Sequence, residues 1–376
     1  MRYQIYIRYI ICGTFCCGCH IVFPMIHNIP KERNAHQFPG REVNKGDSVF
    51  SFIQPAADYR LGEKIILDEK SVNPHGEHLD MFSKLHHTIS FMIIRNDTLL
   101  YESYREKYKD SSLVSGFSVA KSFVSTLVGI AIEEGKIKNV HQSITDFVPE
   151  LKEKGFTPIT VQHLLKHTSG IHYSQQLLNP NSDNAQLYYG KDLRRRMLDF
   201  YIKEQPGLHF DYQSENYQLL GLILERTTGH TLSKYLQEKI WTKIGMENNA
   251  FWNIDNETES RIEKAFCCLS ASTHDFAKLG RLYLNKGNWN GKQVVPRKWI
   301  EEAIHPDTLV GGKINFQYNW IAGPQKYASY YAVGLYGQYV YVYPEKNIII
   351  ARFGKEDLNY NPSYWKTTFL QIIDQL

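Results

Sequence analysis

The sequence predicts a mixed α/β (α+β) fold in which one antiparallel sheet is built from both ends of the chain and a mostly helical domain is inserted between them. Strand patterns occur at residues 89–101 and again from residue 316 to residue 353, whereas the segments between them have the apolar spacing of helices. For strands so far apart along the chain, one sheet built from both ends is the natural way to share a core. With 376 residues, 43% of them hydrophobic, the chain can bury a large core in one domain or two closely joined domains.

The first element is an uncharged, mostly apolar run at residues 9–26, preceded by Arg2 and Arg8. Its 18 residues are just enough to span a bilayer, and positive charge before such a run places the N-terminus in the cytoplasm. We therefore expect residues 1–30 to be a signal peptide or a membrane anchor. A lipoprotein signal that uses Cys19 is a third alternative, less favoured because the residues after Cys19 are apolar. The body of the protein would then be exported to the cell envelope or periplasm, anchored in the membrane by residues 9–26.

The rest of the chain divides into a short leading segment and a main domain. Residues 31–87 are mixed in composition and contain prolines, so we expect them to wrap around the main domain at residues 88–376. The helical insert is expected at about residues 140–305 of that domain.

Capping and turn residues set the predicted boundaries within the main domain. The predicted helices cover residues 119–132, 161–170, 217–227, 273–285 and 363–376. Gly135 and Gly170 end the first two of these helices, Thr160 caps the second, and Thr273 or Ser272 begins the fourth. The predicted strands cover residues 89–95, 98–101, 316–322, 327–335, 338–343 and 348–353.

The helix predicted at residues 119–132 carries the strongest catalytic signal. It is apolar on almost every face, so it belongs in the interior, and Lys121 is its one charged side chain. Ser118 and Lys121 follow the spacing Ser-x-x-Lys, which places both side chains on one face of a helix, one turn apart. A buried lysine loses its proton more easily than usual and can accept the proton of a serine at the helix N-terminus. This pair therefore predicts an activated serine nucleophile.

The same spacing occurs a second time, at Ser363 and Lys366. Nothing but one predicted helix follows Ser363, whereas more than 200 residues follow Ser118 and can supply the rest of a site. We therefore interpret the second copy as a serine near a helix start and a surface lysine.

Tyr212 is the best candidate for a second group that handles protons. It stands just before the apolar helix predicted at residues 217–227, from which it can reach a serine at the start of a buried helix. Near an ammonium group a phenol holds its proton less tightly, so we expect Tyr212 to pass a proton between nucleophile and leaving group.

The cysteines, histidines and charges favour neither a metal nor a nucleic acid. Four of the six cysteines crowd residues 12–19 and the other two, Cys267 and Cys268, are adjacent, which suits neither a disulfide framework nor a zinc motif. We interpret the adjacent pair as small buried hydrophobic residues, with a redox role as a minor option. His163 and His167 lack a third ligand, which favours packing and capping. Because the formal net charge is only +4, we expect no nucleic acid, and neither a cofactor nor an obligate protein partner is indicated.

Five stretches of the chain resemble, in the same order, the penicillin-recognising serine hydrolases, which include class C β-lactamases, DD-peptidases and related esterases and amidases. The stretches are FSVAKSFVSTLVGIAIEEGKI (117–137), ITVQHLLKHTSGI (159–171), PGLHFDYQSENYQLLGLILE (206–225), LSASTHDFAKLGRLYLNKGNWNGKQVVPRKW (269–299) and AVGLYGQYVYVYPEKNIIIARFG (332–354). The chain is most similar to the 6-aminohexanoate-dimer hydrolase-type branch, from about residue 88 to its end. The resemblance implies a β-lactamase-like fold, with helices flanking the antiparallel sheet.

The resemblance also implies roles for individual residues. Ser118 would be the acylated nucleophile, Lys121 its general base and Tyr212 the proton shuttle. The N–H groups of Ser118 and Leu335 would form the oxyanion hole, unless the register of the strand slips by one residue.

The chain departs from the class C pattern at two tripeptides. It has Tyr-Gln-Ser at 212–214 in place of Tyr-x-Asn, and Ala-Val-Gly at 332–334 in place of Lys-Thr-Gly. Ser214 and Gly334 are therefore the expected substrate-binding residues at these positions, and Gly334 lets a substrate approach the strand closely. The missing lysine removes the positive charge that would hold a β-lactam carboxylate, which favours neutral ester or amide substrates.

The sequence thus favours a serine hydrolase that cleaves an ester or amide bond through an acyl-enzyme, without metal or cofactor. Its substrate would be a small molecule or a peptide. Two alternatives remain open: a penicillin-binding sensor or peptidoglycan-interacting module that is acylated without turnover, and a true β-lactamase or DD-peptidase.

Overall fold

The computed structural model describes residues 37–69, 73–176, 179, 181–308, 311–355 and 362–376. The predicted signal or anchor segment, residues 9–26, lies outside these ranges. No helix within them is long and apolar enough to cross a membrane.

A seven-stranded antiparallel sheet forms the base of the fold. Its strands lie in the order β11, β12, β13, β14, β15, β4, β5. Their bounds are β4 (Thr88–Arg95), β5 (Thr98–Tyr104), β11 (Phe316–Gln317), β12 (Trp320–Ala322), β13 (Tyr330–Gly334), β14 (Gln338–Tyr343) and β15 (Ile348–Gly354). The early strand β4 pairs with the last strand β15, with Ile93 opposite Ile350. The prediction of one antiparallel sheet built from both chain ends is therefore confirmed.

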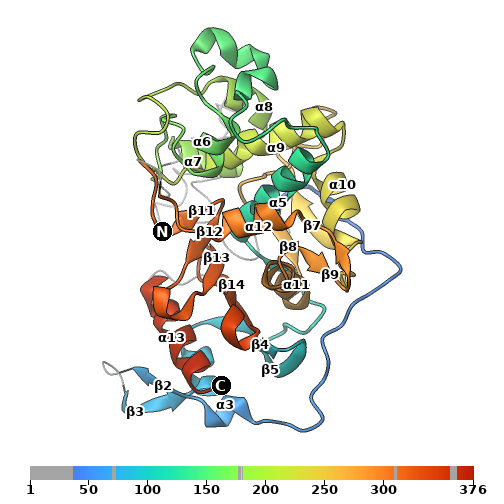
Figure 1. Ribbon diagram of the computed structural model, residues 1–376, viewed down its shortest axis with the longest axis vertical. Helices are drawn as coiled ribbons and strands as arrows, with labels where there is room; N and C mark the ends of the chain where they lie inside the picture. The colour runs from blue at the N-terminus through green and yellow to red at the C-terminus, as the bar shows by residue number, and fades with distance from the viewer. Residues whose placement is uncertain (1–36, 70–72, 177–178, 180, 309–310, 356–361) are drawn as a thin grey trace, which may run out of the picture.

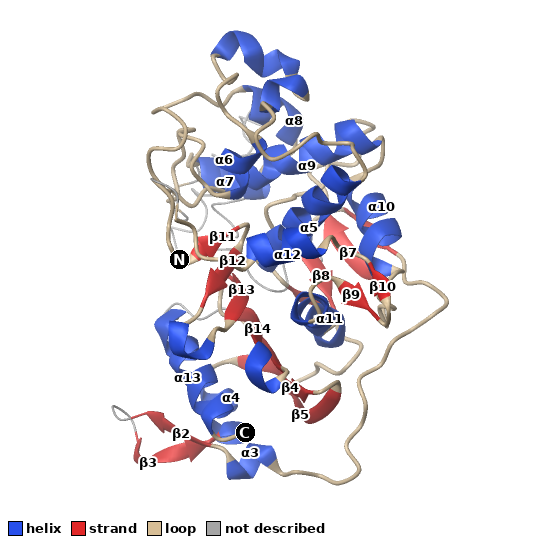
Figure 2. Cartoon of the chain, viewed as in Figure 1, coloured by secondary structure: helices blue, strands red, loops and turns tan. Residues whose placement is uncertain are grey.

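Each face of this sheet is covered by a helix. Successive side chains of a strand point to opposite faces, so Met92 and Ile94 of β4 belong to the main core with α11 (Thr273–Leu284). Phe91 and Ile93 belong to a second core cluster with Phe369 of α13 (Pro362–Asp374). Figure 2 shows α11 and α13 flanking the strands.

Helix α5 (Val119–Glu133) runs through the middle of the molecule, between the sheet and the helical insert (Figure 1). All of its residues from Val119 to Ala131 are buried, as predicted from its apolar sequence. It packs against α9 (Ser214–Thr228) on one side and against β13 and β14 on the other. The N-terminus of α5 therefore lies where the insert meets the sheet.

A second, four-stranded antiparallel sheet ties the chain before α5 to a distant segment. Its order is β1 (Gly40–Val43), β7 (Ala250–Asn253), β8 (Leu269–Ala271) and β6 (Val114–Ser115). In the last pair Val114 lies opposite Ala271, and the Gly116 N–H then donates to the Leu269 carbonyl oxygen at 3.0 Å. This pairing brings residues 266–271 next to the start of α5.

The remaining elements are short. The insert contains η2 (Ile144–Asp146), η3 (Pro149–Lys154), α6 (Val161–Leu165), α7 (Asp183–Tyr189), α8 (Leu193–Leu198), α10 (Leu232–Leu236), the π-helix η4 (Gln237–Trp241), β9 (Asn288–Trp289), β10 (Lys292–Gln293) and α12 (Arg297–Ala303). The leading segment contains α3 (Leu61–Lys64), β2 (Ile66–Glu69), β3 (Asn73–His78) and α4 (Leu79–Leu85). The 3-10 helices η5 (Gln325–Tyr327) and η6 (Pro344–Lys346) connect the late strands.

The single strand predicted at residues 316–322 is wrong. The segment is a hairpin, because Tyr318 and Asn319 both take left-handed backbone conformations, with φ of 47° and 66°. They reverse the chain between β11 and β12, which pair with each other.

Two further boundaries also differ from the prediction. The helix predicted at residues 161–170 ends at Leu165, and His167 then adopts a left-handed backbone with φ 56°. The strand predicted at residues 327–335 begins only with β13, because η5 and the left-handed Ala328 (φ 45°) precede it. In both places a residue with a left-handed backbone lies within the predicted element and limits it.

Candidate active site

The turn before α5 holds Ser118 in a constrained position. Phe117 has a left-handed backbone (φ 44°), a conformation that costs a non-glycine residue about 1–3 kcal/mol and persists only where its surroundings hold it. Its ring packs edge-on against that of Tyr336, with centroids 5.7 Å apart. Ser118 is the N-cap residue of α5, yet its hydroxyl makes no capping hydrogen bond. The Oγ atom is therefore available to other partners.

Lys121 lies one helical turn after Ser118, with its Nζ atom 3.0 Å from Ser118 Oγ. Nζ also donates to the carbonyl oxygen of Phe266 at 2.7 Å. Because only 1% of Lys121 is exposed, burial lowers its pKa to about 7. Near neutral pH a large fraction of the molecules then carry an uncharged amine that can accept the Ser118 proton.

A buried carboxyl group acts on the charge of Lys121. Glu215, in the first turn of α9, is fully buried, and burial raises its pKa well above the usual value. The charge of Glu215 raises the pKa of Lys121 and so opposes the larger effect of burial. Within the part of the chain that the structure describes, the carboxyl oxygens of Glu215 have no hydrogen-bond partner other than the residue's own backbone. Glu215 was not predicted as a site residue. The predicted helix began at residue 217, whereas α9 begins at Ser214, so Glu215 was not expected in a buried first turn.

Tyr212 lies beside the Ser118–Lys121 pair. Its ring centroid is 4.9 Å from Lys121 Nζ. Burial raises the pKa of Tyr212 to about 12, and a hydrogen bond with Ser118 partly offsets this effect. The expectation that the nearby lysine loosens the phenol proton is wrong, because the pKa of Tyr212 rises and burial is the largest cause. Tyr212 therefore keeps its proton at neutral pH and can donate it.

The histidines in this region pack and cap, as predicted. His163 and Thr160 form a capping box at the start of α6, in which the Thr160 N–H donates to His163 Nδ1 at 3.1 Å. His167 accepts a hydrogen bond on Nδ1 from the Gln213 N–H at 3.1 Å, and its ring centroid is 4.4 Å from that of Tyr212. His167 thereby supports the loop that carries Tyr212. Over the described ranges, no group of three or more His, Cys, Asp or Glu residues could hold a metal ion.

Gly334, the last residue of β13, lies against the turn before Ser118. A Cβ atom at this position would lie 2.3 Å from the carbonyl oxygen of Gly116, so no larger residue fits without movement of the backbone. The N–H groups of Ser118 and of Leu335, which follows Gly334, make no hydrogen bond to any other described residue. Two unused backbone donors on adjoining segments are what an oxyanion hole requires.

Asn319 fixes the first turn of α5, a role that the sequence analysis missed. Its Nδ2 donates to the Ser118 carbonyl oxygen at 3.1 Å and to Ser122 Oγ at 2.9 Å. Ser122 Oγ in turn donates to the Asn319 carbonyl oxygen at 3.0 Å. The available signal was the Tyr-Asn dipeptide at 318–319, because asparagine tolerates the left-handed backbone of a tight hairpin turn.

Ser214, predicted to bind substrate, is the first residue of α9 and is buried. Its hydroxyl is hydrogen-bonded to Tyr173, whose own hydroxyl donates to Asn184 Oδ1 at 2.7 Å. A substrate contact at Ser214 therefore stays a prediction.

The second Ser-x-x-Lys pair lies away from this site. It belongs to α13, which packs in the second core cluster, whereas α5 packs in the main core. The side chain of Ser363 is outside the described part of the structure, and Lys366 Nζ lies 5.7 Å from the ring centroid of Tyr331.

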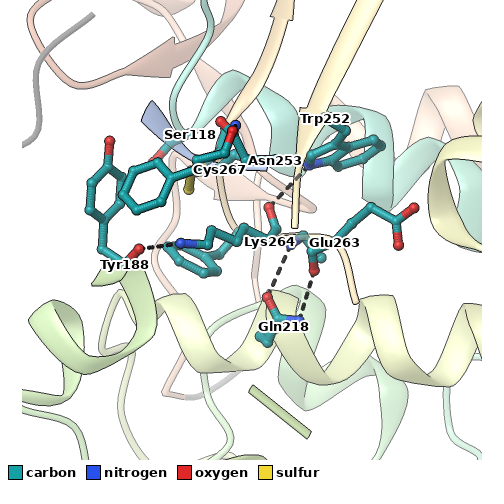
Figure 3. The surroundings of a disulfide bond; sticks show 12 residues. Ser118, Tyr188, Gln218, Trp252, Asn253, Glu263, Lys264 and Cys267 are labelled. Atoms are coloured by element: carbon teal, nitrogen blue, oxygen red, sulfur yellow. Dashed lines mark hydrogen bonds between the residues drawn. A yellow bond between two sulfur atoms is a disulfide. The ribbon is translucent and has the colours of Figure 1, made fainter. Parts of the chain in front are cut away.

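The structure joins Cys267 and Cys268 in a disulfide next to the site (Figure 3). The spacing of the cysteines predicted small buried hydrophobic residues here, with a redox role as a minor option, and no disulfide framework. They are buried, but the left-handed backbone of Cys268 (φ 70°) belongs to a tight turn in which adjacent side chains meet. The turn is held by the indole N–H of Trp252, which donates to the Cys267 carbonyl oxygen at 2.9 Å. Because Phe266 precedes it directly, this turn sets the position of the carbonyl that accepts from Lys121.

The fold and this arrangement define a hydrolase of the beta-lactamase type. A sequence model of the family described as Beta-lactamase matches residues 80–359, and the chain therefore belongs to that family.

Known relatives place the chain within the family. It is 26% identical over 286 residues to the 6-aminohexanoate-dimer hydrolase of Paenarthrobacter ureafaciens, a match that covers 70% of this chain and 72% of that protein. A candidate 6-aminohexanoate-dimer hydrolase from Bacillus anthracis has the same fold, with a TM-score of 0.79, 24% identity and 90% of each chain covered. A family VIII carboxylesterase superposes with a TM-score of 0.61 at 17% identity, over 79% of this chain and 95% of that one. The predicted resemblance to this family and to its 6-aminohexanoate-dimer hydrolase branch is confirmed.

Proposed function

We propose that the protein hydrolyses an ester or amide bond through an acyl-enzyme formed on Ser118. The observation that carries the proposal is the contact between Lys121 and Ser118, in which a buried amine with a pKa near 7 lies 3.0 Å from a serine oxygen. An amine at that distance is within the range in which a general base takes a proton.

The proposed reaction has two halves. In the first, Ser118 Oγ attacks the substrate carbonyl carbon while its proton passes to Lys121, and the leaving group departs with a proton delivered through Tyr212. In the second, water attacks the acyl carbon and gives a proton to the same pair of groups, which return a proton to Ser118 Oγ as the Oγ–acyl bond breaks and a carboxylic acid is released. Tyr212 suits the donor role because its high pKa keeps it protonated.

In this proposal the negative oxygen of the tetrahedral intermediate is bound by the N–H groups of Ser118 and Leu335. Both donors lack a partner among the described residues, and the fit of Gly334 against Gly116 brings their segments together. Loss of one such donor typically lowers kcat by about 10²–10³-fold.

The proposed substrate is a neutral ester or amide rather than a β-lactam. The tripeptide at 332–334 has no lysine to pair with a substrate carboxylate. The names of two relatives, a 6-aminohexanoate-dimer hydrolase and a carboxylesterase, also indicate amide and ester substrates. We further propose that the enzyme is exported and held at the membrane by residues 9–26.

The test compares the wild type with Ser118→Ala and with Ser125→Ala as the matched control. Ser125 lies in the same helix, is fully buried where Ser118 is partly buried, and its hydroxyl makes no hydrogen bond within the described structure. We expect Ser118→Ala to lose labelling by a fluorophosphonate probe and to lose about 10⁴-fold or more of its esterase activity. Ser125→Ala should keep both. Full labelling of Ser118→Ala, or labelling mapped to Ser363 by mass spectrometry, would contradict the proposal.

The same preparation separates the alternatives. We expect p-nitrophenyl acetate to be cleaved much faster than nitrocefin or D-alanyl peptides. Equal rates on nitrocefin would favour a true β-lactamase, and stable acylation by penicillin without turnover would favour the sensor.

A further inference from the structure

The turn between β13 and β14 is held by two buried side chains outside the residues discussed so far. It consists of residues 335–337, because Gly334 pairs with Gln338 across the hairpin. Gln338 Nε2 donates to the Leu335 carbonyl oxygen at 2.9 Å. Arg352, from β15, donates through Nη1 to the carbonyl oxygens of Tyr336 and Gly337 at 2.6 Å and 2.8 Å. Every carbonyl of the turn thus accepts a hydrogen bond from a buried side chain.

Both side chains are themselves firmly placed. Gln338 and Arg352 are each 1% exposed. The Gln338 amide also donates to the Gly354 carbonyl oxygen at 2.8 Å and accepts from the Gly354 N–H at 2.9 Å. Arg352 donates through Nε to Thr88 Oγ1 at 3.0 Å, and its guanidinium stacks on Trp365 at 4.3 Å. The turn is therefore tied to the last strand of the sheet rather than left to its own conformation.

The turn needs such support because its own backbone preferences are weak. Tyr336 and Gly337 both have left-handed backbone, with φ of 63° and 76°. The left-handed region is unfavourable for a tyrosine, and glycine adopts many conformations. Without the side-chain hydrogen bonds, other turn geometries would become accessible.

The orientation of one peptide group in this turn decides the direction of the Leu335 N–H. The Gly334 carbonyl oxygen accepts from the Gly337 N–H at 3.2 Å and so points into the turn. In a trans peptide the N–H and C=O groups point in opposite directions, so the Leu335 N–H points out of the turn. The close contact between Gly334 and the Gly116 carbonyl oxygen places this peptide beside the segment that leads to Ser118.

We propose that Gln338 and Arg352 are positioning residues that aim the Leu335 N–H at the oxyanion. The inference rests on the proposed function, because it concerns the same oxyanion hole. Neither side chain touches the reacting atoms. They act by fixing the carbonyls on the far side of the turn, so that the donor needs no reorganisation as negative charge develops.

The test is Gln338→Met, which keeps the length of the side chain and removes its three hydrogen bonds. We expect kcat on p-nitrophenyl acetate to fall by about 10–10²-fold with KM changed less than about threefold, since only transition-state binding is affected. A boronic acid that mimics the tetrahedral intermediate should lose affinity by about the same factor as kcat/KM. Gln293→Met is the control, because Gln293 also donates two hydrogen bonds to carbonyls, those of Lys286 and Val295, in the distant β9–β10 hairpin.

Arg352 provides a second comparison. Arg352→Lys keeps the charge but removes the guanidinium group whose Nη1 donates to both the Tyr336 and Gly337 carbonyl oxygens. We expect it to show the same loss of kcat and of boronate affinity. Unchanged kcat in Gln338→Met, or a fall in kcat without weaker boronate binding, would overturn the positioning role. If the wild type itself matched Ser118→Ala, the proposed function would fail, and the inference would fall with it.

Discussion

The replacement Lys121→Met tests both the chemistry and the energetics of the site. Methionine fills a similar volume without a charge, so the proposed general base is lost while the packing of α5 is largely kept. We expect kcat/KM to fall by about 10³-fold or more. We also expect the variant to be more stable than the wild type at pH 7, although it removes a hydrogen-bonded side chain.

The size of the stability effect follows from the pKa of Lys121. A pKa that falls from 10.5 to about 7 on folding costs the folded state about 4 kcal/mol at pH 7 and about 2 kcal/mol at pH 9. The variant escapes this cost but leaves the Phe266 carbonyl oxygen unpaired, which costs about 1–3 kcal/mol at either pH. At pH 7 the balance favours the variant. Between pH 7 and pH 9 the unfolded wild type binds more protons than the folded wild type, so wild-type stability rises and the advantage shrinks by about 2 kcal/mol.

Urea unfolding of both proteins at pH 7 and pH 9 measures this difference. Lys278→Met is the control, since Lys278 is also fully buried but is paired with Glu247 at 3.0 Å and Asp275 at 3.3 Å. Removing Lys278 takes the buried cation away from both carboxylates, of which Glu247 keeps only the contact with His274 as an ion pair, and should destabilise the protein at both pH values. A stability difference between wild type and Lys121→Met that does not change with pH would refute the argument that burial lowers the pKa of Lys121.

Further predictions concern the proton donor, the strand and the N-terminus. Tyr212→Phe should lower kcat by about 10²–10³-fold with little change in unfolding free energy, and an unchanged rate would exclude Tyr212 as the donor. The wild-type kcat/KM should rise with pH through a midpoint near 7, as Lys121 loses its proton, and a flat profile from pH 5.5 to pH 8.5 would contradict that assignment. Gly334→Ala should lower both activity and stability, the latter by about 1–3 kcal/mol, because the new Cβ would meet the Gly116 carbonyl oxygen. The full-length chain should sediment with membranes and the chain without residues 1–30 should be soluble and active; misfolding of the shortened chain would show that this segment belongs to the fold.

The sequence predicted those parts of the site that depend on side-chain spacing within one element. Ser118 and Lys121 were found because one turn of an apolar helix fixes their relation, and the strand at 338–343 coincides with β14 because its tyrosines and valines favour a strand. The parts it missed depend on backbone reversals and on backbone acceptors. Nothing in a sequence pattern shows that the carbonyl of Phe266 faces Lys121.

Asn319 illustrates why such features were missed. Its hydrogen bonds to Ser118 and Ser122 exist only because the chain reverses at 318–319, in the middle of a segment whose sequence, FQYNWIA, has the alternating pattern of one strand. Hydrophobic alternation indicates which residues are buried, but it contains little information on where a buried segment turns. A tight hairpin inside a core segment is therefore the kind of element that sequence reasoning joins into one strand.

The pairing of β4 with β15 has a consequence for the order in which the protein becomes active during synthesis. The strand that supplies Leu335 leaves the ribosome more than 200 residues after Ser118, and the sheet cannot close until β15 has been made. Closing so long a loop is slow, because chain entropy is lost before the contacts form. A growing chain therefore holds Ser118, the proposed nucleophile, before the strand that carries Leu335 is in place. On the proposed mechanism, we expect a chain that ends before β15 to carry no activity.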